Sequence, residues 1–124
     1  MDRRVQRVIQ MIEEDIRVNL TLAEMAEAVN LSPSHLYHLF KSETGLAPTR
    51  YVKSLRMSKA KELLETTFLS VKEIVILIGA PDGSHFVRDF KRQYNLTPTQ
   101  YRRLLDGNGS SAEGGGELKR TAAS

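Results

Sequence analysis

The basic side chains of this 124-residue chain gather into two blocks. Residues 32–64 hold six basic and two acidic residues, and residues 82–105 hold five basic and two acidic ones. The stretch before each block is slightly acidic, and the whole sequence carries a formal net charge of +3. A solvated surface more often scatters its charges. Two separate basic blocks therefore predict two contacts with a polyanion such as nucleic acid.

Histidine is the next residue type that could do chemistry. His35 and His38 stand at helical spacing, and His85 repeats His35 fifty residues later. A metal site would need further acidic or histidine ligands that converge on this pair. Leu36 and Phe86 directly follow His35 and His85, which favours an inward packing role for these two histidines. His38 stays open between a nucleic-acid contact and plain solvent exposure, and we expect no metal and no cofactor.

Enzyme chemistry has no basis in the remaining residues. The sequence contains no cysteine, which excludes disulfides, thiolate zinc sites, iron–sulfur clusters and cysteine nucleophiles. It has no phosphate loop, no G-x-S-x-G, no H-E-x-x-H and no carboxylate pair that could share a pocket. We therefore expect the protein not to be an enzyme.

Length and composition fit one small domain. Forty per cent hydrophobic residues suffices for a core. No run of eighteen apolar residues occurs, and the N-terminus lacks the apolar segment of a signal peptide, so we expect a cytoplasmic protein with no membrane partner. Residues 106–124 contain five glycines and three serines without a hydrophobic period. They are expected to form a disordered tail.

Helices are the elements that must position these side chains. Apolar residues at helical spacing from Val5 to Ile16 predict a first helix. Residues suited to capping mark the starts of five more: Thr21, Ser32, Ser70, Asp82 and Thr97. A longer helix should run from Pro48 to about Leu64. No segment alternates as a strand would, so the sequence predicts an all-α fold of about seven helices.

The sequence contains an internal duplication at a shift of 50 residues. Residues 34–51 and 84–101 are identical at eight of eighteen positions, which is well above chance. Upstream the shift becomes 49, because Glu24 aligns with Glu73. The second unit therefore carries one extra residue, within Gly79–Gly83. Each unit consists of a capped helix, a short turn, a second helix and then a helix that begins at proline.

Two helices joined by a short turn, with basic residues on the second, form the helix-turn-helix plan. Each basic block falls on the second half of its unit. We expect one domain over residues 1–105 with four parts: a first helix-turn-helix over about 20–45, a linker helix over about 48–64, a second helix-turn-helix over about 70–94 and a last helix over about 98–105.

Over roughly residues 4–105, the chain resembles the DNA-binding domain of the AraC/XylS family of bacterial transcription regulators. The second unit carries the family's signature stretch: Ile74, Gly79, Ser84, Phe86, Arg88, Phe90, Lys91, Thr97, Pro98, Tyr101 and Arg102. The first unit carries a paired pattern from Leu20 to Tyr51, followed by Arg56. The resemblance implies sequence-specific binding of double-stranded DNA and transcription regulation. It also implies two recognition helices, held by the linker about one DNA turn apart, in successive major grooves.

The resemblance further implies which residues face the DNA bases. They are Ser34, Tyr37 and His38 in the first recognition helix and Gly83, Ser84, Val87 and Arg88 in the second. The spacing of each set places it on one helix face. Arg88 can donate two hydrogen bonds to guanine and Val87 can meet a thymine methyl group. His38 offers one donor instead of a fork, and Gly83 has no side chain.

Phosphate contacts are expected from basic residues in both units and from the N–H groups at helix starts. The residues are Lys41, Arg50, Lys53, Arg56, Lys91 and Arg102. The repetition of Lys41 as Lys91 at one register argues against a random surface charge.

A protein-interaction module is the alternative function. Residues 74–78 are apolar around the whole helix, whereas their counterpart in the first unit includes Glu27. Ile76 and Leu77 are expected to form an exposed patch unless the tail or the linker helix buries them. RNA polymerase could cover this patch, or an effector or dimerisation domain of the kind the family usually carries. The chain has no room for such a domain, so we expect a single-domain member or an excised domain.

Overall fold

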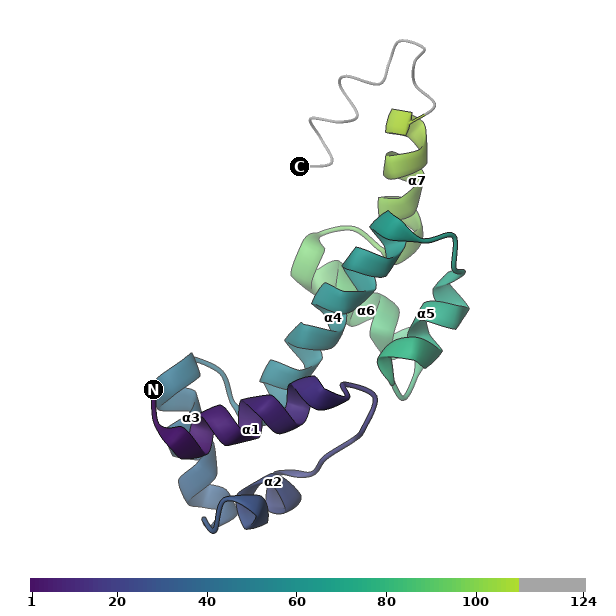
Figure 1. The fold of residues 1–124 in the computed structure, drawn as a ribbon. Coiled ribbons are helices and arrows are strands. Elements are labelled where there is room, and N and C mark those ends of the chain that lie inside the picture. The colour runs from purple at the N-terminus through teal and green to yellow at the C-terminus, as the bar shows by residue number, and fades with distance from the viewer. Residues whose placement is uncertain (110–124) are drawn as a thin grey trace. The chain divides into compact units, whose positions relative to one another are not determined.

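The structure is a computed structural model that describes residues 1–109 of the chain. Those residues form seven α-helices and no strand (Figure 1), which confirms the all-α prediction. The helices are α1 (Arg3–Glu14), α2 (Leu22–Ala28), α3 (Pro33–Thr44), α4 (Pro48–Thr66), α5 (Val71–Ile78), α6 (Gly83–Tyr94) and α7 (Pro98–Gly109). Within the described range, no helix combines the length and the apolar character needed to cross a membrane.

Two compact units divide the chain within α4. The first unit, Met1–Arg56, contains α1, α2, α3 and the first part of α4. The second unit begins at Met57 and contains the rest of α4 followed by α5, α6 and α7. Each unit therefore holds one of the two predicted helix-turn-helix segments, α2–α3 in the first and α5–α6 in the second.

The core of the first unit is built from one apolar face of each of its first three helices. The buried side chains are Val5, Val8, Ile12, Met25, Ala26, Leu36 and Phe40. Tyr51 of α4 packs against this cluster, and its ring lies edge-on to Phe40 with 5.3 Å between centroids. Because Leu36 and Phe40 bury one side of α3, the opposite side of that helix is left at the surface.

The second unit repeats this arrangement with α5, α6 and α7. Ile74 and Ile78 of α5 are fully buried, as are Phe86 and Phe90 of α6 to within 1%. Phe90 packs against Tyr101 of α7 with 6.2 Å between ring centroids, which is the counterpart of the contact between α3 and α4. The surface of α6 opposite these two phenylalanines is accordingly exposed.

Hydrogen bonds at three of the predicted helix starts form capping boxes. In the first, the Glu24 N–H donates to Thr21 Oγ1 at 3.1 Å, and the Thr21 N–H donates to Glu24 Oε1 at 2.8 Å. The same reciprocal bonds join Ser70 with Glu73 and Thr97 with Gln100. Local sequence thus fixes where α2, α5 and α7 begin.

Left-handed residues locate the extra residue of the second unit. Asn30, with φ of 59°, and Gly79, with φ of 76°, follow the first helix of each pair and stand 49 positions apart. The second helices begin at Pro33 and Gly83, which are 50 positions apart. The additional residue therefore lies between Gly79 and Gly83, as the sequence comparison predicts.

The end of the last helix differs from expectation. A tail was predicted from residue 106 onward, but α7 continues to Gly109. The first four residues of the predicted tail are therefore helical, because glycine and asparagine lower helix propensity without forbidding a last turn. The rest of the predicted tail, residues 110–124, lies outside the described residues.

Candidate nucleic-acid interface

The first predicted recognition helix, α3, presents one polar face. Ser32 caps the helix, and its hydroxyl accepts from the His35 N–H at 3.1 Å. With one side of α3 in the core, the predicted base-facing residues Ser34 and His38 are exposed and Tyr37 is half-buried. The structure thus places this predicted set on the surface of one helix.

Tyr37 organises the centre of that face. Its ring meets the ring of His38 edge-on, with 5.3 Å between centroids. Lys41 Nζ lies 5.9 Å from the centroid of the same ring, within the range of a cation–π contact. The three side chains form one cluster that offers an aromatic surface, imidazole nitrogens and an ammonium group.

The second predicted recognition helix, α6, presents a different face. Gly83, Ser84 and Arg88 are exposed, and Val87 is 36% exposed. Gly83 does not have a positive φ, and a Cβ built on it would have nothing within 4 Å. Neither backbone conformation nor packing therefore requires glycine at this position.

The start of α6 carries a carboxylate where α3 carries a hydroxyl. Asp82 Oδ1 accepts from the Ser84 N–H at 2.7 Å and from the His85 N–H at 3.3 Å. These hydrogen bonds, led by the one from Ser84, hold the pKa of Asp82 below its ordinary value. His85 Nδ1 lies 3.2 Å from Asp82 Oδ2, so the imidazole adds to this charged cap.

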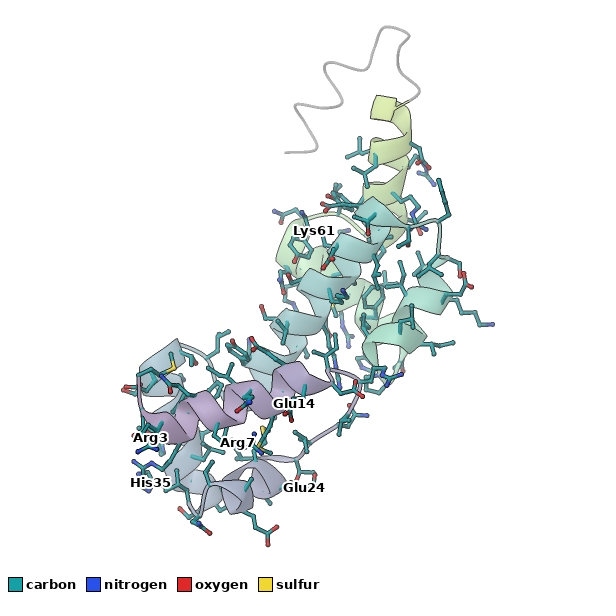
Figure 2. All side chains as sticks on the ribbon, in the orientation of Figure 1. Arg3, Arg7, Glu14, Glu24, His35 and Lys61 are labelled. Atoms are coloured by element: carbon teal, nitrogen blue, oxygen red, sulfur yellow. The ribbon has the colours of Figure 1, made fainter. Side chains whose placement is uncertain are left out.

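The packing role predicted for two histidines is wrong. His35 (labelled in Figure 2) is exposed, and the side chain of His85 is 62% exposed. Each directly precedes a buried residue, but one step along a helix turns the side chain by about 100°. Both histidines therefore lie beside the buried stripe and outside the core. No group of three or more metal-ligating side chains occurs in residues 1–109.

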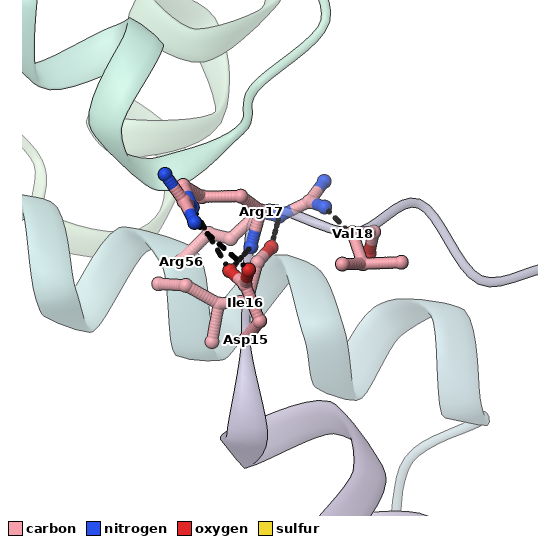
Figure 3. A network of polar contacts seen from close by, with 5 residues as sticks. All are labelled: Asp15, Ile16, Arg17, Val18 and Arg56. Atoms are coloured by element: carbon pink, nitrogen blue, oxygen red, sulfur yellow. Dashed lines mark hydrogen bonds and ion pairs between the residues drawn. The ribbon is translucent and has the colours of Figure 1, made fainter.

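The structure argues against the phosphate contact predicted for Arg56. Arg56 is only 8% exposed. Its Nε donates to the Ile16 carbonyl at 2.7 Å, and its Nη2 donates to the Val18 carbonyl at 3.3 Å (Figure 3). The same Nη2 also donates to Asn19 Oδ1 at 2.8 Å. Burial lowers the pKa of this guanidinium. The side chain holds the loop between α1 and α2, and its donors are engaged there.

The same loop is closed by a second arginine. Arg17 donates from Nε and Nη2 to the two carboxylate oxygens of Asp15, each at 3.0 Å, as Figure 3 also shows. The Arg17 guanidinium lowers the pKa of the Asp15 carboxyl to about 2. The loop before α2 thus contains a local ion pair between Arg17 and Asp15, and Arg56 of α4 joins the loop to the rest of the first unit.

The phosphate contact predicted for Arg102 needs the same correction. Its guanidinium donates to the carbonyls of Leu69 and Thr67, the latter at 3.1 Å, with a longer contact of 3.5 Å to the Leu64 carbonyl. These carbonyls belong to the last turn of α4 and the loop that follows, where a helix leaves acceptors unpaired. Arg102 satisfies them, and its donors face the interior of the second unit.

Four predicted phosphate contacts stay at the surface. They are Lys41, Arg50, Lys53 and Lys91. Lys41 and Lys91 occupy the same place in the two units, each directly after the buried phenylalanine of its recognition helix. Their role as phosphate contacts stays a prediction.

The predicted apolar patch is exposed. Ile76 is 68% exposed and Leu77 is 44% exposed, whereas Ile74 and Ile78 of the same helix are fully buried. The corresponding positions in α2 are Glu27 and Ala28. The two helix-turn-helix segments therefore differ in the outer surface of their first helix.

Comparison with known proteins decides the family. A family model described as a helix-turn-helix domain matches residues 25–104. The chain belongs to the AraC/XylS-type helix-turn-helix family. The matched residues form an AraC-type helix-turn-helix DNA-binding domain.

Curated relatives are transcription regulators. The transcriptional regulator MtrA of Neisseria gonorrhoeae is 35% identical over 102 residues, which cover 82% of this chain and 34% of the relative. The transcriptional activator RhaS of Salmonella schwarzengrund is 33% identical over 105 residues, which cover 85% and 38%. The AraC-family chain thus spans only about a third of the length of the relatives it matches.

Solved structures share the fold. The C-terminal domain of the response regulator yesN from Fusobacterium nucleatum is 35% identical, with a TM-score of 0.75 over 82% of this chain and 99% of that one. The DNA-binding domain of AdpA, solved in complex with a target DNA, is 24% identical with a TM-score of 0.79 over 90% and 98%. The second comparison is evidence of the fold alone.

Proposed function

We propose that α3 and α6 are the recognition helices and that each enters a major groove, so that one AraC-family chain reads two unlike half-motifs in successive grooves. The observation that carries the proposal is the same in both units. A capped helix buries its phenylalanine face, with Phe40 in α3 and Phe90 in α6, and leaves the opposite polar face exposed. This is the arrangement that a helix-turn-helix uses to dock on DNA.

The face of α6 is suited to direct reading of base edges. Arg88 carries a planar fork of donors that matches the O6 and N7 acceptors of guanine. Val87, next to it, offers a methyl surface for the thymine methyl group, and Ser84 can donate or accept. In this assignment α6 supplies the sharper base selection of the two helices.

The face of α3 is suited to a softer mode of contact. The rings of Tyr37 and His38 meet edge-on and offer a hydroxyl group and imidazole nitrogens beside an aromatic surface. Lys41 lies over the ring of the same tyrosine. A histidine gives guanine one donor where arginine would give two. We assign α3 to base contact through Ser34, Tyr37 and His38, with weaker discrimination than α6.

Phosphate contacts supply most of the affinity in this proposal. Lys41, Arg50, Lys53 and Lys91 are placed on surfaces of α3, α4 and α6. Neutralising phosphates releases counterions, so the affinity should fall steeply as salt is added. Base contacts then decide the sequence while the phosphate contacts fix the register.

The test is a fluorescence-anisotropy titration of the protein against a random duplex pool at several salt concentrations, followed by sequencing of the bound fraction. We expect salt-dependent binding and an enriched site with two half-motifs about one helical turn apart. Salt-dependent binding without any enriched motif would reject base reading by α3 and α6. Absence of binding at low salt would reject the proposal as a whole.

A second function is favoured by the exposed Ile76 and Leu77. We propose that this apolar patch docks a protein partner, such as RNA polymerase or an effector or dimerisation domain in a longer parent protein. The duplication offers the matched variant, since Ile76→Glu and Leu77→Ala install the residues found at Glu27 and Ala28. In size-exclusion chromatography, the two variants should no longer associate with the partner protein. A DNA titration of the same variants should show unchanged DNA binding. Unchanged association would reject this function for the patch.

We also propose, together with the DNA-binding function, that the protein is located in the cytoplasm. Transcription regulation in a bacterial cell requires access to the chromosome, which lies in the cytoplasm.

A further inference from the structure

Arg102 of α7 is bound to carbonyls within the second unit and is not available to contact a phosphate. The next residue, Arg103, is exposed enough to make such a contact. Arg102 donates to carbonyls of the loop that follows α4, whereas Arg103 is exposed. One step along the helix separates the two guanidinium groups by about 100°, which is enough to turn one inward and the other outward.

The internal duplication gives Arg103 a counterpart. At the shift of 50, Arg103 corresponds to Lys53, which is also exposed and basic. Arg102 corresponds to Val52, which packs partly buried against the first core. By register, therefore, the outward cation of α7 is Arg103 and the inward position is Arg102.

In each unit an aromatic contact joins the proposed recognition helix to the helix that follows it. In the first unit Phe40 and Tyr51 join α3 to α4, with 5.3 Å between ring centroids. Lys41 follows that phenylalanine by one residue, and Lys53 follows that tyrosine by two. The relation between α3 and α4 is thus fixed at the residues that carry the two lysines.

The second unit repeats this relation with other cations. Phe90 and Tyr101 join α6 to α7, with 6.2 Å between ring centroids. Lys91 follows the phenylalanine by one residue, and Arg103 follows the tyrosine by two. The same steps along matched helices therefore carry a basic side chain at both places in both units.

We propose that each unit holds the DNA backbone with two cations, one on the recognition helix and one on the helix after it, and that Arg103 is the α7 member. The pairs are Lys41 with Lys53 and Lys91 with Arg103. This inference rests on the proposed function, because it assigns the phosphate contacts that flank α3 and α6. A guanidinium can donate two parallel hydrogen bonds to a phosphate, so Arg103 is well suited to the role.

The test measures how strongly DNA binding depends on salt in Arg103→Gln. Each lost phosphate contact should reduce the slope of log affinity against log salt by about 0.9. Between 50 and 200 mM salt, Arg103→Gln should therefore lose roughly 3-fold less affinity than the parent protein. The loss at low salt should be the same for the selected site and for unrelated duplexes, because phosphates carry no sequence information.

Two matched variants make the result specific. Lys59→Gln removes a basic residue from the exposed surface of α4, where it lies 3.5 Å from Glu62, and it should leave the slope unchanged. Arg103→Lys keeps the charge and should restore the parent slope. Helix content and thermal midpoint of Arg103→Gln should match the parent, since the side chain donates no hydrogen bond that holds a loop.

The outcomes separate this inference from the proposed function. If the parent protein binds DNA with a steep salt slope but Arg103→Gln behaves like Lys59→Gln, the assignment of Arg103 is wrong while DNA reading by α3 and α6 stands. If the parent protein shows no salt-dependent binding, both are wrong. A loss confined to one selected sequence would also overturn the assignment, because it would mark a base contact.

Discussion

Arg56 of α4 donates from Nε to the carbonyl of Ile16 at 2.7 Å, across forty residues of sequence. The same guanidinium reaches Asn19, so one side chain closes the loop between α1 and α2. That loop leads into α2, the first helix of the first helix-turn-helix. A residue that a charge count assigns to DNA therefore serves the interior of the fold.

Arg56→Ala should destabilise the first unit by about 2–3 kcal/mol. The substitution removes the donor that the Ile16 and Val18 carbonyls share in this partly buried loop, and hydrogen bonds from a charged group are the stronger ones to lose. Arg56→Lys should recover only part of this free energy, since an ammonium group cannot reproduce the planar fork. Chemical denaturation followed by helix content measures the effect. A loss of DNA affinity with unchanged unfolding free energy would instead restore a phosphate role.

Arg88→Ala should weaken binding to the selected DNA site by about 1–3 kcal/mol and relax one base position. The reason is the loss of two parallel hydrogen bonds to a guanine edge. Arg88→Lys is the control, because it keeps the charge and loses the fork. Sequencing of the DNA bound by each variant reads the outcome. An unchanged preference in Arg88→Ala would show that the reading face of α6 lies elsewhere.

Lys91→Ala should weaken binding to all sequences alike and reduce the salt slope by about 1. Its counterpart Lys41→Ala should behave in the same way if both units contact the backbone at equivalent positions. Lys41 also lies over the ring of Tyr37, so its removal should disturb base preference in the first half-motif as well. Titrations at three or more salt concentrations distinguish the two effects.

Thr97→Ala should destabilise the second unit by about 1 kcal/mol. The Thr97 hydroxyl accepts from the Gln100 N–H at 3.1 Å at the start of α7, and alanine leaves that donor without a partner. The first unit shows that the fold tolerates this loss, because Ala47 stands at the matching position. Thermal unfolding of Thr97→Ala and Thr97→Ser should give a lowered midpoint for the first variant only.

The start of α6 should lose stability in acid. The pKa of Asp82 is lowered in the folded state by the hydrogen bonds it accepts, so its contribution is present above the unfolded value of 3.8. That contribution disappears as the pH falls from about 4 through the folded pKa. Asp82→Ser keeps a cap, as Ser32 does in α3, and should flatten this part of the pH profile. An identical acid profile in the two proteins would contradict the assignment.

Sequence predicts the helix starts of this fold well because caps are local. Thr21 and Ser70 each find their partner three residues later, within reach of any helix that begins there. The duplication also needs no tertiary information, and the left-handed Asn30 and Gly79 place its extra residue as predicted. The family pattern then adds the recognition faces of α3 and α6.

The roles of arginine could not be obtained in the same way. Arg56, Arg102 and Arg103 are alike as charges, and only the structure shows which of them faces unpaired carbonyls. The ends of helices and loops create such acceptors, and the acceptors of Arg102 lie more than thirty residues away in sequence. One signal was present. Shifted by 50, Arg102 aligns with apolar Val52 and Arg103 aligns with basic Lys53.

The predicted packing role of His35 and His85 is wrong for a simpler reason. A neighbour in sequence is not a neighbour in direction on a helix, so the burial of Leu36 says little about His35. The tail prediction failed at its first residues because composition identifies a weak helix former without fixing the residue at which a helix ends.

Gly83 stands at the leading end of α6 with open space around it and an ordinary backbone conformation. A residue with a Cβ could therefore replace it without backbone strain and without a clash at that atom. A new operator preference could arise here by one substitution, with no compensating change elsewhere. Natural variation or protein engineering can therefore change the side chain at this position while the rest of the domain stays unchanged.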